Sequence, residues 1–299
     1  MRILSQSEGE KKYIGAEHLR KRNNDIMKRF YRFIFISLVA FSCEKPIDWD
    51  LQTEDLNSIV VEAIITSEFK TQEIKLSYTI TDMNANPLPV TGAKVSVSFQ
   101  PYSISFEESE SYPGVYYSTE QFRGATDVEY TLKIELDTIE YTATTNMVNL
   151  QIYNTPPFVY FPEVNAYRLL WDFYQYSPVE QSFTDVIVVW NHIPGYEHPD
   201  SLSSARLQFY KFKTIDVSYI VAPQDREKVF FPQGSIAYCS KYSLNDEFGA
   251  YLRAVLIESQ WQGSLFEASR ANPLGNISGG ALGFFAVCDV MRDTLEVGQ

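Results

Sequence analysis

Polar and apolar residues alternate through much of the segment between residues 58 and 148, which is the pattern of strands with one buried face. Ile74, Leu76, Tyr78 and Ile80 fall on the same side of one such strand, because successive side chains of a strand point to opposite faces. Runs rich in β-branched and aromatic residues predict strands at residues 59–65, 73–80, 93–99, 103–108, 115–118, 130–136 and 140–144. One-sided burial indicates antiparallel sheets, so we expect an immunoglobulin-like or transthyretin-like β-sandwich domain over residues 58–148.

The segment 183–299 again predicts strands, interrupted by one helix. Its strand-like runs lie at residues 183–190, 205–212, 216–221, 281–287 and 294–297. The pattern of an amphipathic helix, with apolar residues at spacings of three and four, is formed by Phe248, Tyr251, Leu252, Val255 and Leu256. Residues 243–246, Ser-Leu-Asn-Asp, have the form of a capping box in front of it. We therefore expect a mainly β protein whose β-rich C-terminal domain contains one amphipathic helix at about residues 244–260.

The segment 149–182 between these two regions is irregular, rich in proline and unusually aromatic. Aromatic side chains carry a large apolar area and are most often buried. Our main interpretation is therefore a connector whose rings pack between two β units. The alternative is an aromatic surface that stacks on a sugar, a base or a peptide, for which the candidates are Tyr160, Tyr167, Trp171 and Tyr174.

An apolar run at residues 33–41 follows Lys28, Arg29 and Arg32 and precedes Ser42-Cys43. The run is far shorter than the ~20 residues that a membrane-spanning helix needs, and it fits the apolar region of a secretory signal. A buried strand or short helix is the alternative, which the basic residues in front do not favour. The order predicts a lipoprotein signal that is cleaved before Cys43, so that Cys43 becomes acylated and anchors the protein to a membrane.

These features divide the chain into five segments. Residues 1–42 form the signal region, and because Met27 stands where an ordinary signal begins, we interpret residues 1–26 as a mis-assigned start. Residues 43–57 contain few apolar positions and are expected to be the lipid anchor and its tether. The body then consists of the sandwich, the connector and the C-terminal domain.

Composition and charge narrow the function classes. With 45% hydrophobic and 15% aromatic residues, the chain can bury substantial cores and is not disordered. Its formal net charge is −13 at pH 7, although the signal region is net basic. An acidic surface repels phosphate backbones, so we expect no nucleic-acid partner.

Cys239 and Cys288 are the cysteines that follow Cys43. An exported chain meets an environment that permits disulfides, so one interpretation is a disulfide between these two residues. The other is a pair of small buried thiols, which are common in cores. Neither belongs to a C-x-x-C pair, so a zinc ribbon or a thioredoxin-like site is not supported.

Motifs that carry catalytic chemistry are not found in the sequence. A phosphate-binding loop, an H-E-x-x-H helix and a G-x-S-x-G elbow are absent. His192 and His198 lie near Glu197 and Asp200 in a Pro-Gly loop, where such residues could bind a divalent ion but are also common in turns. A Ser-His-Asp arrangement needs no local motif, so a hydrolase that uses the His192/His198 loop is kept as an alternative. We assign no catalytic, cofactor-binding or metal-binding residue, and expect no enzyme and no cofactor.

Several short motifs resemble those of a known family. They are residues 59–66 (IVVEAIIT), 88–95 (LPVTGAKV), 112–116 (YPGVY), 251–255 (YLRAV) with 261–263 (WQG), and 276–285 (NISGGALGFF). The sequence resembles the Bacteroidetes outer-membrane lipoproteins that contain domain of unknown function 4249 (DUF4249), from about Cys43 to the C-terminus. These motifs consist of glycines and apolar residues, so they specify a fold more than an activity. The spacing between Gly124 and Tyr130 is longer than is usual in that family.

The resemblance implies a protein anchored in the outer membrane, on its cell-surface or periplasmic face, that works beside a TonB-dependent receptor in nutrient uptake. It carries no catalytic residues over to this chain. Our leading hypothesis is a non-enzymatic binding or accessory subunit with an unknown ligand. The first alternative is a structural or adhesive β-sandwich protein of the surface, and the second is the hydrolase.

Overall fold

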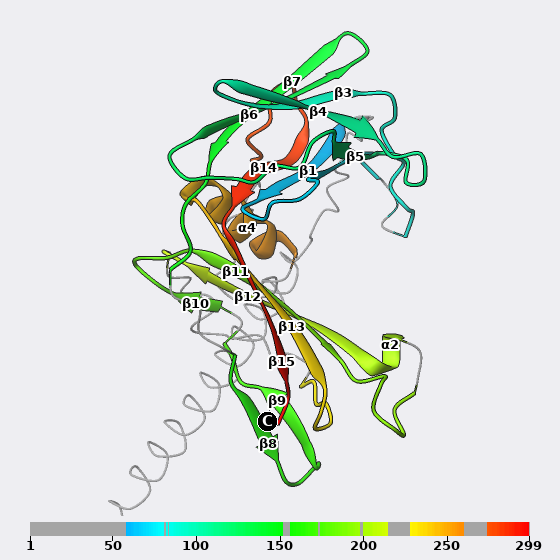
Figure 1. Cartoon of the computed structure of the whole chain (residues 1–299), viewed down its shortest axis with the longest axis vertical. Helices are drawn as coiled ribbons and strands as arrows, with labels where there is room; N and C mark the ends of the chain where they lie inside the picture. Colours follow the sequence, from blue (N-terminus) through cyan, green and yellow to red (C-terminus); the bar gives the residue numbers. More distant parts are fainter. Residues whose placement is uncertain are drawn as a thin grey trace, which may run out of the picture. The chain divides into compact units, whose positions relative to one another are not determined.

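The computed structural model describes residues 58–80, 82, 84–151, 156–172, 174–197, 200–214, 228–259 and 274–298 (Figure 1). These residues belong to one compact unit, Asp55–Gln299. The signal region, Cys43, the tether, the strand predicted at 216–221 and His198 lie outside the described residues.

The first sheet contains eight strands in the order β14-β1-β2-β5-β4-β3-β6-β7. Their bounds are β1 Ile59–Thr66, β2 Glu73–Tyr78, β3 Lys94–Phe99, β4 Tyr102–Glu108, β5 Val115–Ser118, β6 Glu129–Leu136, β7 Ile139–Asn146 and β14 Leu282–Cys288. All the strands predicted between residues 58 and 148 are present. The eighth, β14, comes from near the C-terminus and pairs in parallel with β1, with Val60 opposite Leu282. All eight strands are hydrogen-bonded into one continuous sheet.

The two edges of this sheet are brought together by the loop in front of β14. The backbone N–H of Ser278 donates to the carbonyl of Thr142 in β7 (2.8 Å), and Ser278 Oγ accepts from the N–H of Thr142 (2.8 Å). Asn276 Nδ2 donates to the carbonyl of Thr144 in β7 (3.3 Å) and to that of Phe285 in β14 (2.8 Å). The Asn-Ile-Ser-Gly-Gly segment therefore links β7 to β14 and nearly closes the sheet.

The inside of the first sheet is the larger hydrophobic core. In β1, Ile59, Val61, Ala63 and Ile65 are at most 2% exposed, while Glu62 between them faces outward. This is the alternation that the sequence predicts for a strand with one buried face. The outward face of β1 is the side that carries the candidate site described below.

The second sheet contains five strands in the order β10-β12-β11-β13-β15. Their bounds are β10 Tyr174–Tyr176, β11 Ser182–Val189, β12 Ser204–Phe212, β13 Ile236–Ser243 and β15 Val290–Glu296. A separate hairpin consists of β8 Phe158–Phe161 and β9 Ala166–Leu169, and a short helix α2 spans Asp200–Ser203. The strands β8, β9, β10 and β13 were not predicted from the sequence.

The chain passes from one sheet into the other at Asp289, between β14 and β15. Strand β14 is buried on both faces, with Phe285 and Val287 in the first core and Phe284 and Ala286 in a second cluster. The first and second sheets therefore do not follow the division of the chain predicted at residue 148, because a C-terminal strand completes the N-terminal sheet.

The predicted helix is α4, Asp246–Ser259. Its N-terminal cap is Asn245, whose Oδ1 accepts from the N–H of Phe248 (2.9 Å). The capping box expected at Ser243 is not formed, because Ser243 Oγ accepts instead from the N–H of Asp289 (2.8 Å). Phe248 stacks on Phe284 at 4.9 Å between ring centroids, so α4 covers the outer face of β14. No helix in the described ranges is long and apolar enough to cross a membrane.

Candidate functional site

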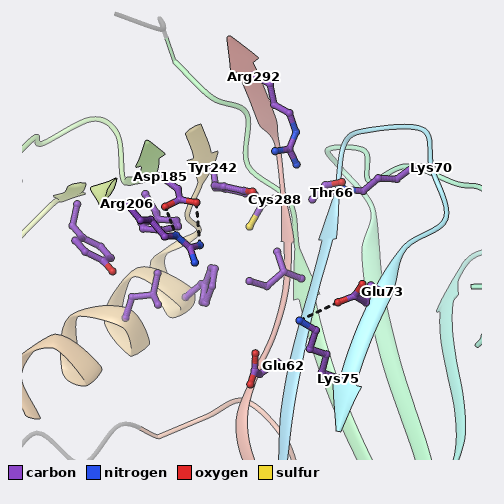
Figure 2. A pocket seen from close by; sticks show the side chains of 15 residues that line it. Glu62, Thr66, Lys70, Glu73, Lys75, Asp185, Arg206, Tyr242, Cys288 and Arg292 are labelled. Atoms are coloured by element: carbon purple, nitrogen blue, oxygen red, sulfur yellow. Dashed lines mark hydrogen bonds and ion pairs between the residues drawn. The ribbon is translucent and has the colours of Figure 1, made fainter. Parts of the chain in front are cut away.

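A cavity of about 400 Å³ lies between the outer face of the first sheet, the second sheet and α4 (Figure 2). The first sheet contributes the outward side chains of β1 and β2, among them Glu62, Ile64 and Lys75. These positions face away from the core because the alternate residues of the same strands fill it. The cavity is therefore a direct consequence of one-sided burial in β1 and β2.

Aromatic and aliphatic side chains form the opposite wall. Phe183 of β11 lies between Tyr210 and Tyr242, at centroid distances of 5.1 Å and 5.8 Å. Phe248 and Leu252 of α4 also line the cavity. This wall offers apolar contact area in fixed orientations, as is typical of sites for small molecules.

One ion pair is embedded in this wall. Arg206 Nε donates to Asp185 Oδ1 (2.7 Å) and Arg206 Nη2 donates to Asp185 Oδ2 (3.0 Å), which is bidentate geometry. The hydrogen bonds that Arg206 donates to Asp185 raise the pKa of Arg206 above its usual value. The pair is electrically satisfied within itself and contributes no net charge to the cavity.

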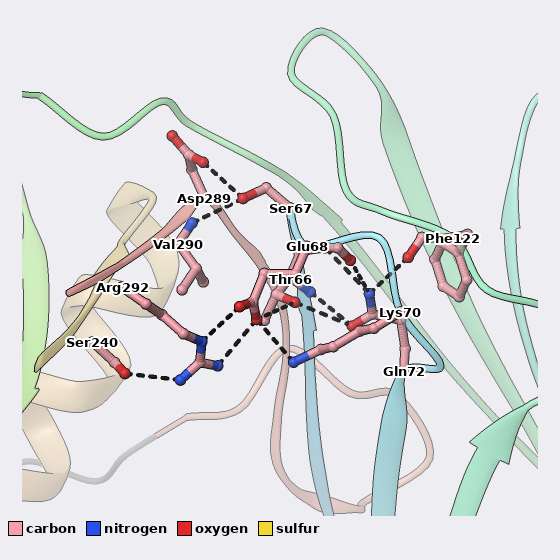
Figure 3. A network of polar contacts seen from close by, with 10 residues as sticks. All are labelled: Thr66, Ser67, Glu68, Lys70, Gln72, Phe122, Ser240, Asp289, Val290 and Arg292. Atoms are coloured by element: carbon pink, nitrogen blue, oxygen red, sulfur yellow. Dashed lines mark hydrogen bonds and ion pairs between the residues drawn. The ribbon is translucent and has the colours of Figure 1, made fainter. Parts of the chain in front are cut away.

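Glu68, in the loop between β1 and β2, binds two cationic side chains that line one end of the cavity (Figure 3). Arg292 of β15 donates to it through Nε (2.6 Å to Oε1) and Nη2 (3.0 Å to Oε2), and Lys70 Nζ donates to Oε2 (3.0 Å). The hydrogen bond from Arg292, helped by Lys70 and opposed by partial burial, lowers the pKa of Glu68 to about 2. Two cations therefore share one carboxylate, which leaves this end of the cavity positive.

Gln72 holds the same loop in place. Its side chain is fully buried and accepts from the N–H of Thr66 (3.0 Å). Its amide group donates to the carbonyls of Glu68 (3.0 Å) and Phe122 (2.8 Å). The position of Glu68 is thus set by a buried hydrogen-bond network.

Glu62 lies at the other end of the cavity, on the same face of β1 as Ile64 and Thr66 (Figure 2). It is directly opposite Lys75 in the register of β1 and β2. Lys75 Nζ, however, is 3.2 Å from Glu73 Oε1. Burial and the nearby charge of Glu62 raise the pKa of Tyr251. Within the part of the chain that the structure describes, the Glu62 carboxylate has no hydrogen-bond or ion-pair partner, so this end is negative.

The candidate aromatic side chains have different ring partners. Tyr160 and Tyr167 pack together across the β8–β9 hairpin at 5.2 Å, and Tyr160 OH donates to Asn165 Oδ1 (2.8 Å). Trp171 packs instead on Phe209, at 5.3 Å. Tyr167 and Trp171 are packed against the core cluster of the second sheet. The side chain of Tyr174 is outside the described residues.

His192 is exposed, and its Nε2 lies 3.0 Å from the carbonyl oxygen of Gly234. His198, its proposed neighbour in a metal or hydrolase site, falls outside the described residues. Among the residues that the structure does describe, no group of three or more His, Cys, Asp or Glu side chains is arranged to hold a metal ion.

Cys239 and Cys288 are both buried and are not joined to each other. They belong to different hydrophobic clusters, that of the second sheet and that around α4. Burial, with a smaller contribution from the charge of Asp289, raises the pKa of Cys288 to about 12. In the structure the two cysteines are therefore buried free thiols and do not form a disulfide with each other.

Sequence reasoning did not predict the cavity or its charged ends. The outward positions of β2 were visible as the polar side of an alternating strand. Arg206 and Arg292, which also line the cavity, come from distant strands, and no local pattern indicates that those strands face β1. The cavity is a tertiary feature that only the packing of the sheets reveals.

The sequence matches a protein family, although it matches no individual curated protein. A family model, the domain of unknown function DUF4249, matches residues 44–294, which include the first sheet, α4, every residue of the cavity and the second sheet except the last two residues of β15. Because the match extends over most of the sequence, the chain belongs to the DUF4249 family.

Proposed function

We propose that this protein is a lipid-anchored outer-membrane protein that binds a ligand in the cavity between its sheets without transforming it, as an accessory subunit of a TonB-dependent receptor in nutrient uptake. The cavity is the observation that carries this proposal. Its volume of about 400 Å³ is within the range of ~300–1,000 Å³ that is usual for small-molecule sites. Its lining combines aromatic rings with a few placed charges, the composition expected of such a site.

The walls of the cavity are held rigidly, which favours binding of a defined ligand. Asp289, at the passage from β14 to β15, accepts from Ser67 Oγ (2.8 Å) and from the N–H of Leu150 (2.9 Å). Arg292 donates through Nη1 to Ser240 Oγ (2.8 Å) while it holds Glu68. Hydrogen bonds and an ion pair therefore join the first and second sheets at the edge of the cavity.

The lipid anchor is supported by the signal pattern that ends at Cys43, and the receptor partner is what the resemblance to the DUF4249 lipoproteins implies. A body tethered by residues 43–57 reaches at most about 50 Å from its membrane anchor, at ~3.3 Å per extended residue. A captured ligand is then held close to the same membrane. A transport receptor in that membrane could accept the ligand from this protein and import it.

Affinity capture from gently solubilised outer membranes tests the proposal. We expect a TonB-dependent receptor to be recovered with the wild-type protein, and acyl chains on Cys43 by mass spectrometry of the N-terminus. The matched Cys43→Ala variant should remain uncleaved or be released, and should lose the receptor. Recovery of the protein alone would support the structural or adhesive alternative, and an N-terminus without acyl chains would exclude the lipid anchor.

A further inference from the structure

We propose that the ligand is a linear peptide of three or four residues with apolar side chains, bound with its ammonium group at Glu62 and its carboxylate at Arg292 and Lys70. This inference rests on the proposed binding function and names the class of ligand. It follows from the charges at the two ends of the cavity, the distance between those ends and the apolar wall between them.

One wall of the cavity follows β1. Glu62, Ile64 and Thr66 are alternate residues on one face of this strand and all line the cavity. At ~3.3 Å per residue, Glu62 and Thr66 are about 13 Å apart along the strand. Glu62 and the Arg292–Lys70 pair lie at opposite ends of the site in Figure 2.

The end near Thr66 is suited to a carboxylate. Arg292 uses Nε, Nη1 and Nη2 once each in its bonds to Glu68 and Ser240. A guanidinium group has five N–H donors and an ammonium group has three. Arg292 and Lys70 therefore keep N–H groups for a second acceptor, and the single charge of Glu68 balances only one of the two cations. A ligand carboxylate would restore neutrality there.

The end near Glu62 is suited to an ammonium group. Lys75 lies beside Glu62 but is paired with Glu73, so these three side chains together carry one negative charge. A ligand ammonium group would give Glu62 the partner that the described residues do not provide.

The cavity as a whole is neutral although the chain carries a net charge of −13. The acidic groups Glu62, Glu73 and Asp185, together with Glu68, equal in number the basic groups Lys70, Lys75, Arg206 and Arg292. Such an arrangement favours a ligand with one charge of each sign over a simple anion or cation.

The spacing selects a short peptide over a single amino acid. An extended chain spans at most ~3.3–3.6 Å per residue, so the ~13 Å from Glu62 to Thr66 along β1 corresponds to three or four residues. In a free amino acid the ammonium group and the carboxylate are both attached to Cα, so they cannot reach both ends. Between the ends, Ile64, Phe183, Phe248 and Leu252 present apolar surface to the peptide side chains.

The test uses a mixture of tri- and tetrapeptides built from alanine, leucine, phenylalanine and tyrosine. Native mass spectrometry of the full mature protein should show bound peptides from the mixture with free termini. The same mixture, N-acetylated or C-amidated, should be retained at least about tenfold more weakly, because each modification removes one charged contact. Absence of bound peptide, or equal binding of the free and modified mixtures, would overturn the proposal.

Variants identify the two ends. In Glu62→Gln, calorimetry of the best binder should show about tenfold weaker affinity, and N-acetylation should cause no further loss. In Lys70→Met, C-amidation should lose its effect in the same way. Such coupling between variant and modification would not arise from a general structural disturbance. Glu140→Gln, which changes an exposed carboxylate paired with Lys133 on β7, is the control and should bind all peptides as the wild type does.

The peptide assignment and the proposed function fail in different ways. If the receptor is recovered with the protein but peptides do not bind, the ligand class is wrong and the accessory function stands. If peptides bind with the predicted end specificity but no receptor is recovered, the ligand class stands and the partnership is wrong.

Discussion

Arg292 and Glu68 are 224 positions apart in the chain, and they form a bidentate ion pair in which Arg292 Nε lies 2.6 Å from Glu68 Oε1. The pair connects β15 of the second sheet to the loop between β1 and β2 of the first sheet (Figure 3). It therefore joins the two walls of the cavity at its positive end.

Glu68→Gln is expected to lower stability in a pH-dependent way. The pKa of Glu68 is lowered to about 2 from 4.5, so its ion pairs stabilise the fold fully above about pH 4.5 and lose that effect as the pH falls toward 2. Because the pair is partly exposed, we expect a loss of about 1 kcal/mol at pH 7. Urea unfolding of both proteins should show this difference shrinking below pH 4.5. A difference that grows on acidification would contradict the role of Glu68.

Asp289→Ala should weaken the connection between the first and second sheets. Ser67 Oγ and the N–H of Leu150 would lose their acceptors, at a cost of about 1–3 kcal/mol. Chemical denaturation is the measurement, with the exposed Glu296→Ala as the control that should change stability little. Equal stability of the two variants would show that water replaces these bonds.

Glu180 forms a buried ion pair with Lys241, at 2.6 Å between Glu180 Oε1 and Lys241 Nζ. Glu180→Ala should cost about 3 kcal/mol or more, because it removes a carboxylate from a lysine that is only 4% exposed. The double variant Glu180→Leu/Lys241→Met should be more stable than Glu180→Ala, since it leaves no buried charge behind at this pair. Chemical denaturation should give a higher unfolding midpoint for the double variant than for Glu180→Ala. A higher midpoint for Glu180→Ala would show that Lys241 is stabilised mainly by other contacts.

Gly283→Ala should destabilise the first sheet much more than Gly280→Ala. Both glycines have positive φ, of 94° and 79°, but a Cβ at Gly283 would collide with the carbonyl of Val61 in β1, whereas a Cβ at Gly280 would meet nothing within 4 Å. We expect about 1 kcal/mol for Gly280→Ala, from backbone strain alone, and at least about 3 kcal/mol for Gly283→Ala. Thermal unfolding measures both, and equal effects would mean that β14 can shift away from β1.

Cys239 and Cys288 should both be alkylated by iodoacetamide after unfolding without reductant. In the native protein Cys288 should react very slowly, because it is buried and its pKa is raised to about 12. Mass spectrometry counts the modified thiols. Protection of both cysteines in the unfolded protein would demonstrate a disulfide in the exported form.

The parts of the fold that were predicted correctly depend on local patterns. The alternation of Ile74, Leu76 and Tyr78 determines which face of β2 is buried, and the spacing from Phe248 to Leu256 determines α4. Strand β13 was missed because Ser240, Lys241 and Ser243 make its sequence polar, although all three side chains are buried. Their burial depends on neighbouring strands and on partners such as Glu180.

The pairing of strands that are far apart in the chain could not be predicted from the sequence. The run at residues 281–287 predicted a strand, but nothing in it identified β1 as its parallel partner. The same limit applies to the cavity, because no local pattern identifies the residues that face Glu62.

Strand β14 has a consequence for how the protein matures. A ribosome releases the chain from its N-terminus, so β1 must wait for a strand that begins more than two hundred residues later, at Leu282. Until then one side of β1 has open peptide groups that can recruit a foreign strand. High contact order of this kind slows folding, and we expect newly made chains to depend on chaperones until nearly the whole polypeptide has emerged.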